Sequence, residues 1–140
     1  MNILKILIID DDPISIFLTK KVIEKADIKA DVLPYDNAAS ALSFLKKLND
    51  INEIPDVIFL DLNMPIMNGW EFIEHFSKLD DEIKTKVTLF ILSASDNHND
   101  IAKAANYPFI KKYISKPIAI NQIKYLLSSD KTLSVSENNY

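Results

Sequence analysis

The 140-residue sequence has no cysteine and only one glycine, Gly69. Without cysteine the chain forms no disulfide, no thiolate-ligated zinc site and no thiol nucleophile. It also lacks an apolar run of membrane-spanning length. The first apolar segment, Ile3 to Ile9, is interrupted by Lys5 and runs into three aspartates, unlike a signal peptide. We therefore expect a cytoplasmic protein that neither spans nor binds a membrane.

Positive charge is also scarce, because 16 Lys and Arg stand against 20 Asp and Glu. Nucleic acid and anionic lipid both require a basic face, so we expect neither as a partner. A length of 140 residues and a hydrophobic content of 48% suit one globular domain. We expect this domain to cover residues 1–128 and a polar, flexible tail to cover 129–140.

Short apolar runs alternate with amphipathic segments along the chain. The pattern predicts five strands, at residues 3–9, 31–35, 56–60, 87–92 and about 112–115. It predicts five helices, which begin near residues 13, 38, 70, 97 and 120. Polar residues 80–86 are expected only to connect a helix to a strand. This order is typical of an α/β fold in which a doubly wound, five-stranded parallel sheet carries helices on both faces.

Local residues predict how the helices begin and which side they bury. Asp12 is the expected N-cap of the first helix, with Pro13 in its first turn. The apolar residues expected to face inward from this helix are Ile14, Phe17, Leu18 and Val22. The expected caps of two later helices are Asp36 or Asn37, and Ser95 or Asp96.

The third predicted strand ends abruptly at Asp61 after four apolar residues. A run without alternation is typical of a strand that is buried on both faces. Pro65 and Gly69 follow within eight positions; Pro65 fixes φ, and Gly69 permits a backbone angle that other residues avoid. The strand thus delivers one carboxylate to a stiff loop.

Polar side chains follow four of the five predicted strands: Asp10, Asp11 and Asp12, then Asp61, Ser93 and Lys116. The carboxyl ends of parallel strands meet at one edge of a sheet, where ligands bind. Crowded carboxylates repel unless a cation offsets them, so the acids predict a bound hard cation. Magnesium fits best, since it prefers oxygen ligands and pairs with phosphate.

Beside such a cation, the Asp61 carboxylate can act as a nucleophile toward a phosphoryl group. Ser93 and Lys116 can then hydrogen-bond and neutralise the phosphoryl oxygens. Each residue alone has a simpler explanation: Asp12 as a helix cap, Ser93 as a polar strand end and Lys116 as a solvated lysine. Their joint arrangement at successive strand ends favours a phosphorylation site.

Four segments carry a family resemblance: Ile-Leu-Ile-Ile-Asp-Asp-Asp-Pro, Phe-Leu-Asp-Leu-Asn-Met-Pro-Ile-Met-Asn-Gly, Ile-Leu-Ser-Ala and Tyr-Ile-Ser-Lys-Pro. In order and spacing they resemble the receiver domain of bacterial two-component response regulators, from Ile3 to about Ser128. The resemblance implies a flavodoxin-like sheet with strand order 2-1-3-4-5. It implies Asp61 as phosphoacceptor and Asp11 as a direct magnesium ligand, with Asp10 reaching the metal largely through water. The backbone carbonyl of Asn63 is implied as a further ligand.

The same resemblance implies a switch. Ser93 matches the hydroxyl that moves toward the phosphoryl group, and Lys116 matches the lysine that contacts it. Tyr113 matches an aromatic residue whose rotamer follows the hydroxyl, although an ordinary half-buried tyrosine explains it nearly as well. One departure is the segment 105–112, which is bulky and basic and lacks the glycine common in the family.

The resemblance implies a signalling phosphoacceptor rather than an enzyme. The phosphoryl group would come from a sensor histidine kinase or histidine phosphotransfer protein, and output would go to an unidentified downstream protein. An alternative is a haloacid-dehalogenase-like phosphatase with Asp10 as nucleophile and Asp12 at the required spacing. A third reading, a receiver-like module that works without phosphorylation, is disfavoured because the full acid, hydroxyl and lysine set is present.

Overall fold

The computed structural model describes residues 3–128, and its centre is one five-stranded sheet. The strands are β1 (Leu4–Ile9), β2 (Ala30–Tyr35), β3 (Val57–Leu60), β4 (Thr88–Ser93) and β5 (Ile110–Ser115). They lie in the order β2-β1-β3-β4-β5, and each neighbouring pair is parallel. The predicted doubly wound sheet and its order 2-1-3-4-5 are confirmed.

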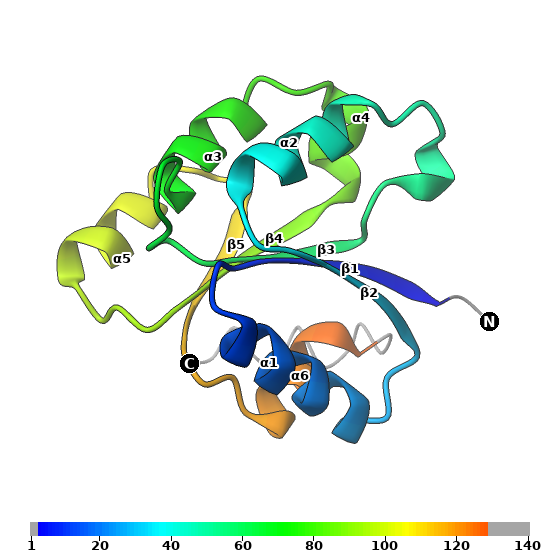
Figure 1. Ribbon diagram of the computed structural model, residues 1–140, viewed down its shortest axis with the longest axis vertical. Helices are drawn as coiled ribbons and strands as arrows, with labels where there is room; N and C mark the ends of the chain where they lie inside the picture. The colour runs from blue at the N-terminus through cyan, green and yellow to red at the C-terminus, as the bar shows by residue number, and fades with distance from the viewer. Residues whose placement is uncertain (1–2, 129–140) are drawn as a thin grey trace.

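Six α-helices surround the sheet within the described residues. They are α1 (Pro13–Lys25), α2 (Ala38–Lys46), α3 (Gly69–Phe76), α4 (Asp81–Lys86), α5 (His98–Ala104) and α6 (Ile120–Leu127). A 3₁₀ turn, η1 (Ile51–Glu53), precedes β3. Helices α1 and α6 cover one face, α2, α3 and α4 cover the other, and α5 lies beyond α3 near the end of the sheet (Figure 1).

The prediction of five helices was wrong because it treated residues 80–86 as a connection, and α4 lies there. This helix has six residues and buries only Ile83, so it produces no periodic apolar pattern. Its charges suit the helix dipole, with acids in the first turn and lysines in the last.

The core is divided by the sheet into two clusters of buried apolar residues. In β1, Leu7 and Ile9 join the cluster beneath α2 and α3, whereas Ile6 and Ile8 join the cluster beneath α1 and α6. All four side chains are at most 2% exposed. Because helices cover both faces, the strand needs apolar residues at successive positions rather than alternation.

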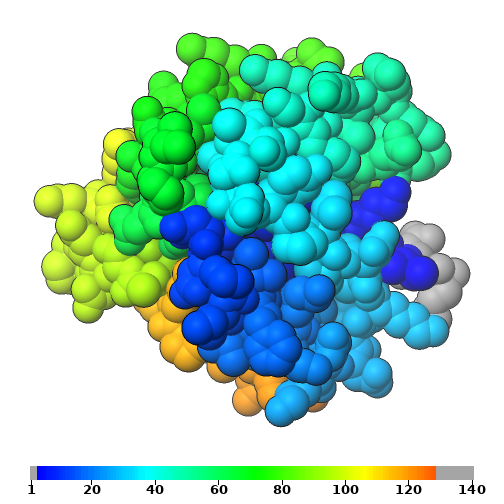
Figure 2. All heavy atoms as spheres, viewed as in Figure 1, coloured from blue at the N-terminus to red at the C-terminus, as the bar shows by residue number. Residues whose placement is uncertain are grey.

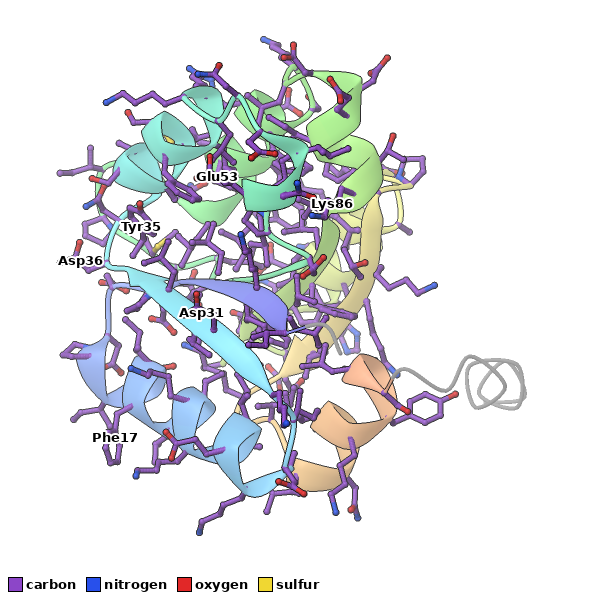
Figure 3. All side chains as sticks on the ribbon, turned by 90° about the vertical axis from the view of Figure 1, so that its right-hand side faces the viewer. Phe17, Asp31, Tyr35, Asp36, Glu53 and Lys86 are labelled. Atoms are coloured by element: carbon purple, nitrogen blue, oxygen red, sulfur yellow. The ribbon has the colours of Figure 1, made fainter. Side chains whose placement is uncertain are left out.

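The predicted inward face of α1 was wrong for three of its four residues and right for Val22, which is partly buried and packs against the core. Ile14, Phe17 and Leu18 are 50% or more exposed, whereas Thr19 and Ile23 are buried. Phe17 points outward from the helix, away from the sheet (Figure 3). The helix carries two overlapping apolar series, and the series that contains Ile23 packs against the cluster of buried residues that it shares with α6 and the sheet.

Helix caps agree with the predictions in part. Asp12 caps α1 as predicted, because its Oδ1 accepts a hydrogen bond of 3.0 Å from the backbone N–H of Ile14. Of the two candidates for α2, Asn37 is the cap. The candidates for α5 were both wrong: the cap is Asn97, whose side chain accepts from the backbone of Asn99.

No helix within residues 3–128 is both long and apolar enough to cross a lipid bilayer. The predicted flexible tail, residues 129–140, lies outside the described residues.

Candidate functional site

The carboxyl ends of β1, β3, β4 and β5 meet at the left of Figure 1, where α1 begins. The backbone hydrogen bonds of the sheet continue one residue past the strands: the N–H of Asp61 donates to the carbonyl of Ile9 at 2.9 Å. The N–H of Lys116 likewise donates to the carbonyl of Ser93 at 2.9 Å. Main-chain bonds therefore fix where the acid and the lysine leave the sheet.

Three carboxylates gather at this edge. Ligand oxygens of Asp10, Asp11 and Asp61 lie within 4.8 Å of one another. The ammonium of Lys116 lies 2.8 Å from Asp10 Oδ2 and 3.7 Å from Asp61 Oδ1. In the space-filling view, the start of α1 lies beside the segment that follows β3 (Figure 2). Three carboxylates and one ammonium leave a formal charge of −2, which one divalent cation would balance.

The three acids of the first strand end have different surroundings. Asp10 is buried, and both of its carboxylate oxygens accept hydrogen bonds from the protein. Oδ1 accepts from the N–H of Asp12 at 3.0 Å. Oδ2 accepts from the hydroxyl of Ser15 at 2.7 Å and from the ammonium of Lys116. The side chain of Asp12 is engaged as the α1 cap. Asp11 is exposed to solvent, which leaves its carboxylate the most accessible of the three to an incoming ion.

The Asp61 carboxyl group is buried, with 5% of the residue exposed, and burial raises its pKa from 3.8 to about 6. Lys116 opposes this rise, the charge of Asp10 adds to it, and a backbone hydrogen bond from Asn63 lowers the pKa again. Burial and the neighbouring carboxylate thus disfavour the charged form of Asp61 more than Lys116 favours it. A hard divalent cation, which prefers carboxylate oxygens, fits that donor set.

The loop between β3 and α3 is shaped by a close approach at Gly69. Gly69 does not use the unusual backbone angle that glycine permits, because its φ is not positive. A Cβ atom at this position would lie 2.6 Å from the carbonyl oxygen of Asp61 and 2.7 Å from Leu62 Cα. Glycine is therefore required for steric reasons. Any larger side chain at position 69 would clash with the backbone of Asp61 and Leu62, against which α3 begins.

Two further features of this loop were not predicted. Ile66 has a φ of 70° and its side chain is fully exposed, although β-branched residues rarely adopt such angles. Asn68 and Glu71 form a capping box at the start of α3, in which each side chain accepts from the other residue's N–H, at 2.9 and 3.0 Å. The Asn-x-x-Glu spacing could have revealed this second feature.

On the other side of the acid pocket, Ser93 and Tyr113 both contact Ser95. The N–H of Ser95 donates to the fully buried Ser93 hydroxyl at 3.2 Å, and the Tyr113 hydroxyl donates to the Ser95 carbonyl at 2.7 Å. The side chain of Tyr113 is half-buried and turned toward the segment between β4 and α5. Ser95 therefore connects the two residues implied as a switch.

The structure brings together the predicted acid, lysine and hydroxyl residues at one sheet edge. It also adds Ser15, which donates to Asp10. Sequence reasoning missed this residue, although its position one turn into a helix that begins beside Asp10 could have suggested it.

The sequence and the fold were compared with those of known proteins. A family model described as the response regulator receiver domain matches residues 6–128. A response regulator receiver protein from Dyadobacter fermentans is 30% identical with a TM-score of 0.80, covering 94% of this chain and 98% of that one. A two-component response regulator from Cytophaga hutchinsonii is 29% identical with a TM-score of 0.80, and both chains are covered completely.

The curated relatives are much longer. A hybrid signal transduction histidine kinase from Dictyostelium discoideum is 28% identical over 97% of this chain, but only 11% of that protein is covered. The chain spans at most 22% of the first four curated relatives. These relatives therefore share with it one unit of a larger protein.

Proposed function

Because the chain belongs to the response regulator receiver domain family, we propose that Asp61 is the residue on which this phosphoacceptor takes up a phosphoryl group. The carrying observation is that buried Asp61 lies in a cluster with two other carboxylates and beside the Lys116 ammonium. A structural ion pair needs one acid and one base. Three acids around one base leave unbalanced charge, which is destabilising unless a ligand supplies the balance.

The phosphoryl group would be transferred from a phosphohistidine. One Asp61 carboxylate oxygen attacks phosphorus, the P–N bond of the donor breaks, and its electron pair returns to the imidazole, which takes a proton from solvent. Lys116 lies 3.7 Å from Asp61 Oδ1, within reach of the phosphoryl oxygens once they are attached. The Ser93 hydroxyl, at the end of the adjacent strand, can donate to the same oxygens. The protein's part is chiefly positioning and charge stabilisation.

Asp10, Asp11 and Asp61 would hold a divalent cation, which we propose is magnesium, and the Asn63 carbonyl would add a ligand from the loop. Bound there, the ion would offset the negative charge of the acids and of the phosphoryl group. The hydrogen bonds on both oxygens of Asp10 support its contact with the ion through water, and the exposure of Asp11 supports direct contact.

We propose that phosphorylation favours the arrangement in which Tyr113 donates to the Ser95 carbonyl. A phosphoryl group brings a charge near −2 and strong acceptors, which draw the Ser93 hydroxyl toward Asp61. Movement of Ser93 also moves Ser95, which hydrogen-bonds it, and Tyr113 follows. The surface of α5, β5 and α6 then differs between the two states, and a protein partner can distinguish them.

The chain's place in the cell follows from this role. The phosphodonor would be a sensor histidine kinase or histidine phosphotransfer protein in the cytoplasm. Output would pass to a downstream protein rather than to nucleic acid or membrane, in line with the net charge of −4. Beyond its own phosphorylation and dephosphorylation, the domain would catalyse no reaction.

The phosphatase alternative with Asp10 as nucleophile finds no support. Three donors occupy the oxygens of Asp10, and the ammonium of Lys116 contacts Asp10 more closely than Asp61. A carboxylate engaged in this way is a poor nucleophile, since attack would require it to give up those hydrogen bonds.

The site of phosphorylation can be tested directly. We expect acetyl phosphate with magnesium to add one phosphoryl group to the protein, as seen by intact mass spectrometry, and Asp61→Asn to reduce this labelling by about 100-fold or more, since the nucleophile is lost. The exposed Asp36→Asn change is a matched control that should label normally. Peptide mapping that placed the phosphoryl group on Asp10 would contradict the proposal.

A further inference from the structure

One acidic side chain connects α5 to two separate parts of the molecule. The carboxylate of Asp100 accepts from the indole N–H of Trp70 at 3.0 Å through Oδ1, and from the hydroxyl of Ser95 at 3.3 Å through Oδ2. Trp70 belongs to α3 and lies directly after Gly69, whereas Ser95 follows β4. The two oxygens of one carboxylate therefore join α3, the helix after the loop that follows Asp61, to Ser95, which hydrogen-bonds both Ser93 and Tyr113.

The indole ring of Trp70 is fixed from two more directions. It stacks on Tyr107, with ring centroids 6.1 Å apart and an interplanar angle of 28°. The Lys103 ammonium lies 4.7 Å from its centroid, in cation–π geometry. The phenol of Tyr107 in turn donates to Glu74 of α3 at 2.7 Å. Because the ring is anchored on several sides, its N–H presents a fixed donor to Asp100.

Ser95 forms hydrogen bonds both with Asp100 and with the two residues proposed as the switch. Its hydroxyl is held by Asp100, its carbonyl accepts from Tyr113, and its N–H donates to Ser93. The hydrogen bonds of Asp100 lead to Tyr113 through Ser95, and to the loop after Asp61 through Trp70. We call the arrangement in which the Tyr113 hydroxyl donates to the Ser95 carbonyl the inward state of Tyr113. Displacing Ser95 would move the carbonyl on which this state depends.

We propose that Asp100, held by Trp70, is a positioning residue that stabilises the inward state of Tyr113 even without phosphorylation. This inference rests on the proposed function, since it concerns the same switch. Trp70, Asp100 and Ser95 hold the carbonyl where the Tyr113 hydroxyl reaches it. A ligand that favours the inward state then binds more tightly, because a larger fraction of the protein has Tyr113 in that state before the ligand binds.

The test uses two variants, each of which changes one partner in the hydrogen bonds of Asp100. Trp70→Phe removes the N–H donor but keeps an aromatic ring beside Tyr107 and Lys103. Asp100→Asn removes the charge and leaves a single acceptor oxygen, so the Trp70 N–H and the Ser95 hydroxyl can no longer both donate to this side chain, and a contact from the new amide N–H to the Ser95 oxygen would have the opposite direction. Asp96→Asn, an exposed acid in the same segment, is the charge-matched control for the second variant.

Two readouts separate positioning from a merely structural role. Fluorine NMR of the 3-fluorotyrosine-labelled protein follows Tyr113, whose signal is identified by its loss in Tyr113→Phe. Titration with beryllofluoride in saturating magnesium measures affinity for a phosphoryl analogue, and each variant is also measured in the Tyr113→Phe background. Thermal melting confirms that each protein is folded; if Asp100→Asn does not fold, Trp70→Phe alone decides.

We expect both variants to lower the inward population of Tyr113 and to weaken beryllofluoride binding by roughly three- to tenfold, the range for one lost hydrogen bond. Asp96→Asn should match the unmodified protein, and the effect should vanish in the Tyr113→Phe background. The positioning role would be overturned if the Tyr113 signal and the beryllofluoride affinity were unchanged in both variants. It would also be overturned if the variants lost as much affinity in the Tyr113→Phe background. Either result would leave the phosphoacceptor function intact. No response of the unmodified protein to beryllofluoride would overturn both.

Discussion

Two sides of the sheet edge are built by different means: the acceptor side, with the proposed phosphoacceptor Asp61 and Lys116, and the switch side, with the proposed switch residues Ser93 and Tyr113 and their neighbours Ser95 and Asp100. On the acceptor side, Asp61 and Lys116 leave the sheet from backbone bonds to neighbouring strands, and Gly69 packs against the Asp61 backbone. On the switch side, side chains make the connections: Tyr113 bonds a carbonyl, and Asp100 bridges two residues. The β4–β5 pairing there also contains a register shift between Leu89 and Phe90.

This difference suits the two tasks that we propose for these sides. Phosphoryl transfer requires groups that stay in place, and backbone bonds within buried strands open only with large parts of the fold. A switch requires two states of similar free energy. Side-chain bonds to half-buried residues each contribute about 1 kcal/mol net, so they can be exchanged without unfolding the domain.

The largest effect is expected where the acceptor side is closest packed. Gly69→Ala places a methyl group 2.6 Å from the Asp61 carbonyl oxygen. We expect the free energy of unfolding to fall by about 3 kcal/mol, since backbone must shift and the helix propensity gained from alanine is smaller. Chemical denaturation measures this loss. His75→Ala, at an exposed position of the same helix, should change stability little; equal losses in both would remove the argument from close packing.

A smaller effect is expected from the buried charge of the acceptor side. In metal-free protein the folded-state pKa of Asp61 is about 6, above its ordinary value of 3.8, because of burial. Between these values the folded state binds more protons than the unfolded state, so the free energy of unfolding falls as pH rises through this window. The destabilisation is complete above pH 6 and absent below 3.8.

Asp61→Asn removes this pH dependence. We expect the variant to be more stable than the unmodified protein by roughly 1–3 kcal/mol at neutral pH, and the difference to shrink toward pH 4. Denaturation in the presence of EDTA across this range measures it, with the exposed Glu82→Gln as control. A difference that is constant with pH would show that Asp61 is not the group responsible.

The smallest effect is expected on the switch side. Tyr107→Phe removes the hydroxyl that donates to Glu74 but keeps the ring beside Trp70 and Phe109. Because the bond is formed at the surface, we expect a loss of only about 0.5 kcal/mol in the free energy of unfolding. Thermal denaturation with Glu74→Gln as a partner-side variant checks it. If Tyr107→Phe lowered the free energy of unfolding as much as Gly69→Ala does, the proposed difference in rigidity between the two sides would be contradicted.

The acceptor side could be predicted from the sequence because its signals are local. Apolar runs that end in a carboxylate, a serine or a lysine locate the strand ends, and parallel order brings them together. The same residues carry the resemblance to the family, and the strand order was predicted only from that resemblance. The reason for Gly69 could not be predicted, since its close contact involves residues seven and eight positions earlier.

The rest escaped prediction because its signals are weak or remote. Helix α1 carries two apolar series, and which one faces inward depends on α6, far along the chain. Helix α4 buries a single isoleucine and lacks a side-chain cap. The bond between Trp70 and Asp100 joins residues 30 positions apart, and no periodic pattern reports such a pair.

Ile66 carries a further consequence. Its φ of 70° is disfavoured for a β-branched residue, and its fully exposed side chain gains nothing from the domain's own core. Glycine would relax this backbone, so a laboratory selection for heat resistance alone should replace Ile66 early. A second selection, for signalling in the cell, would then show whether isoleucine returns. The sequence that best stabilises this loop in isolation is thus different from the one the chain carries.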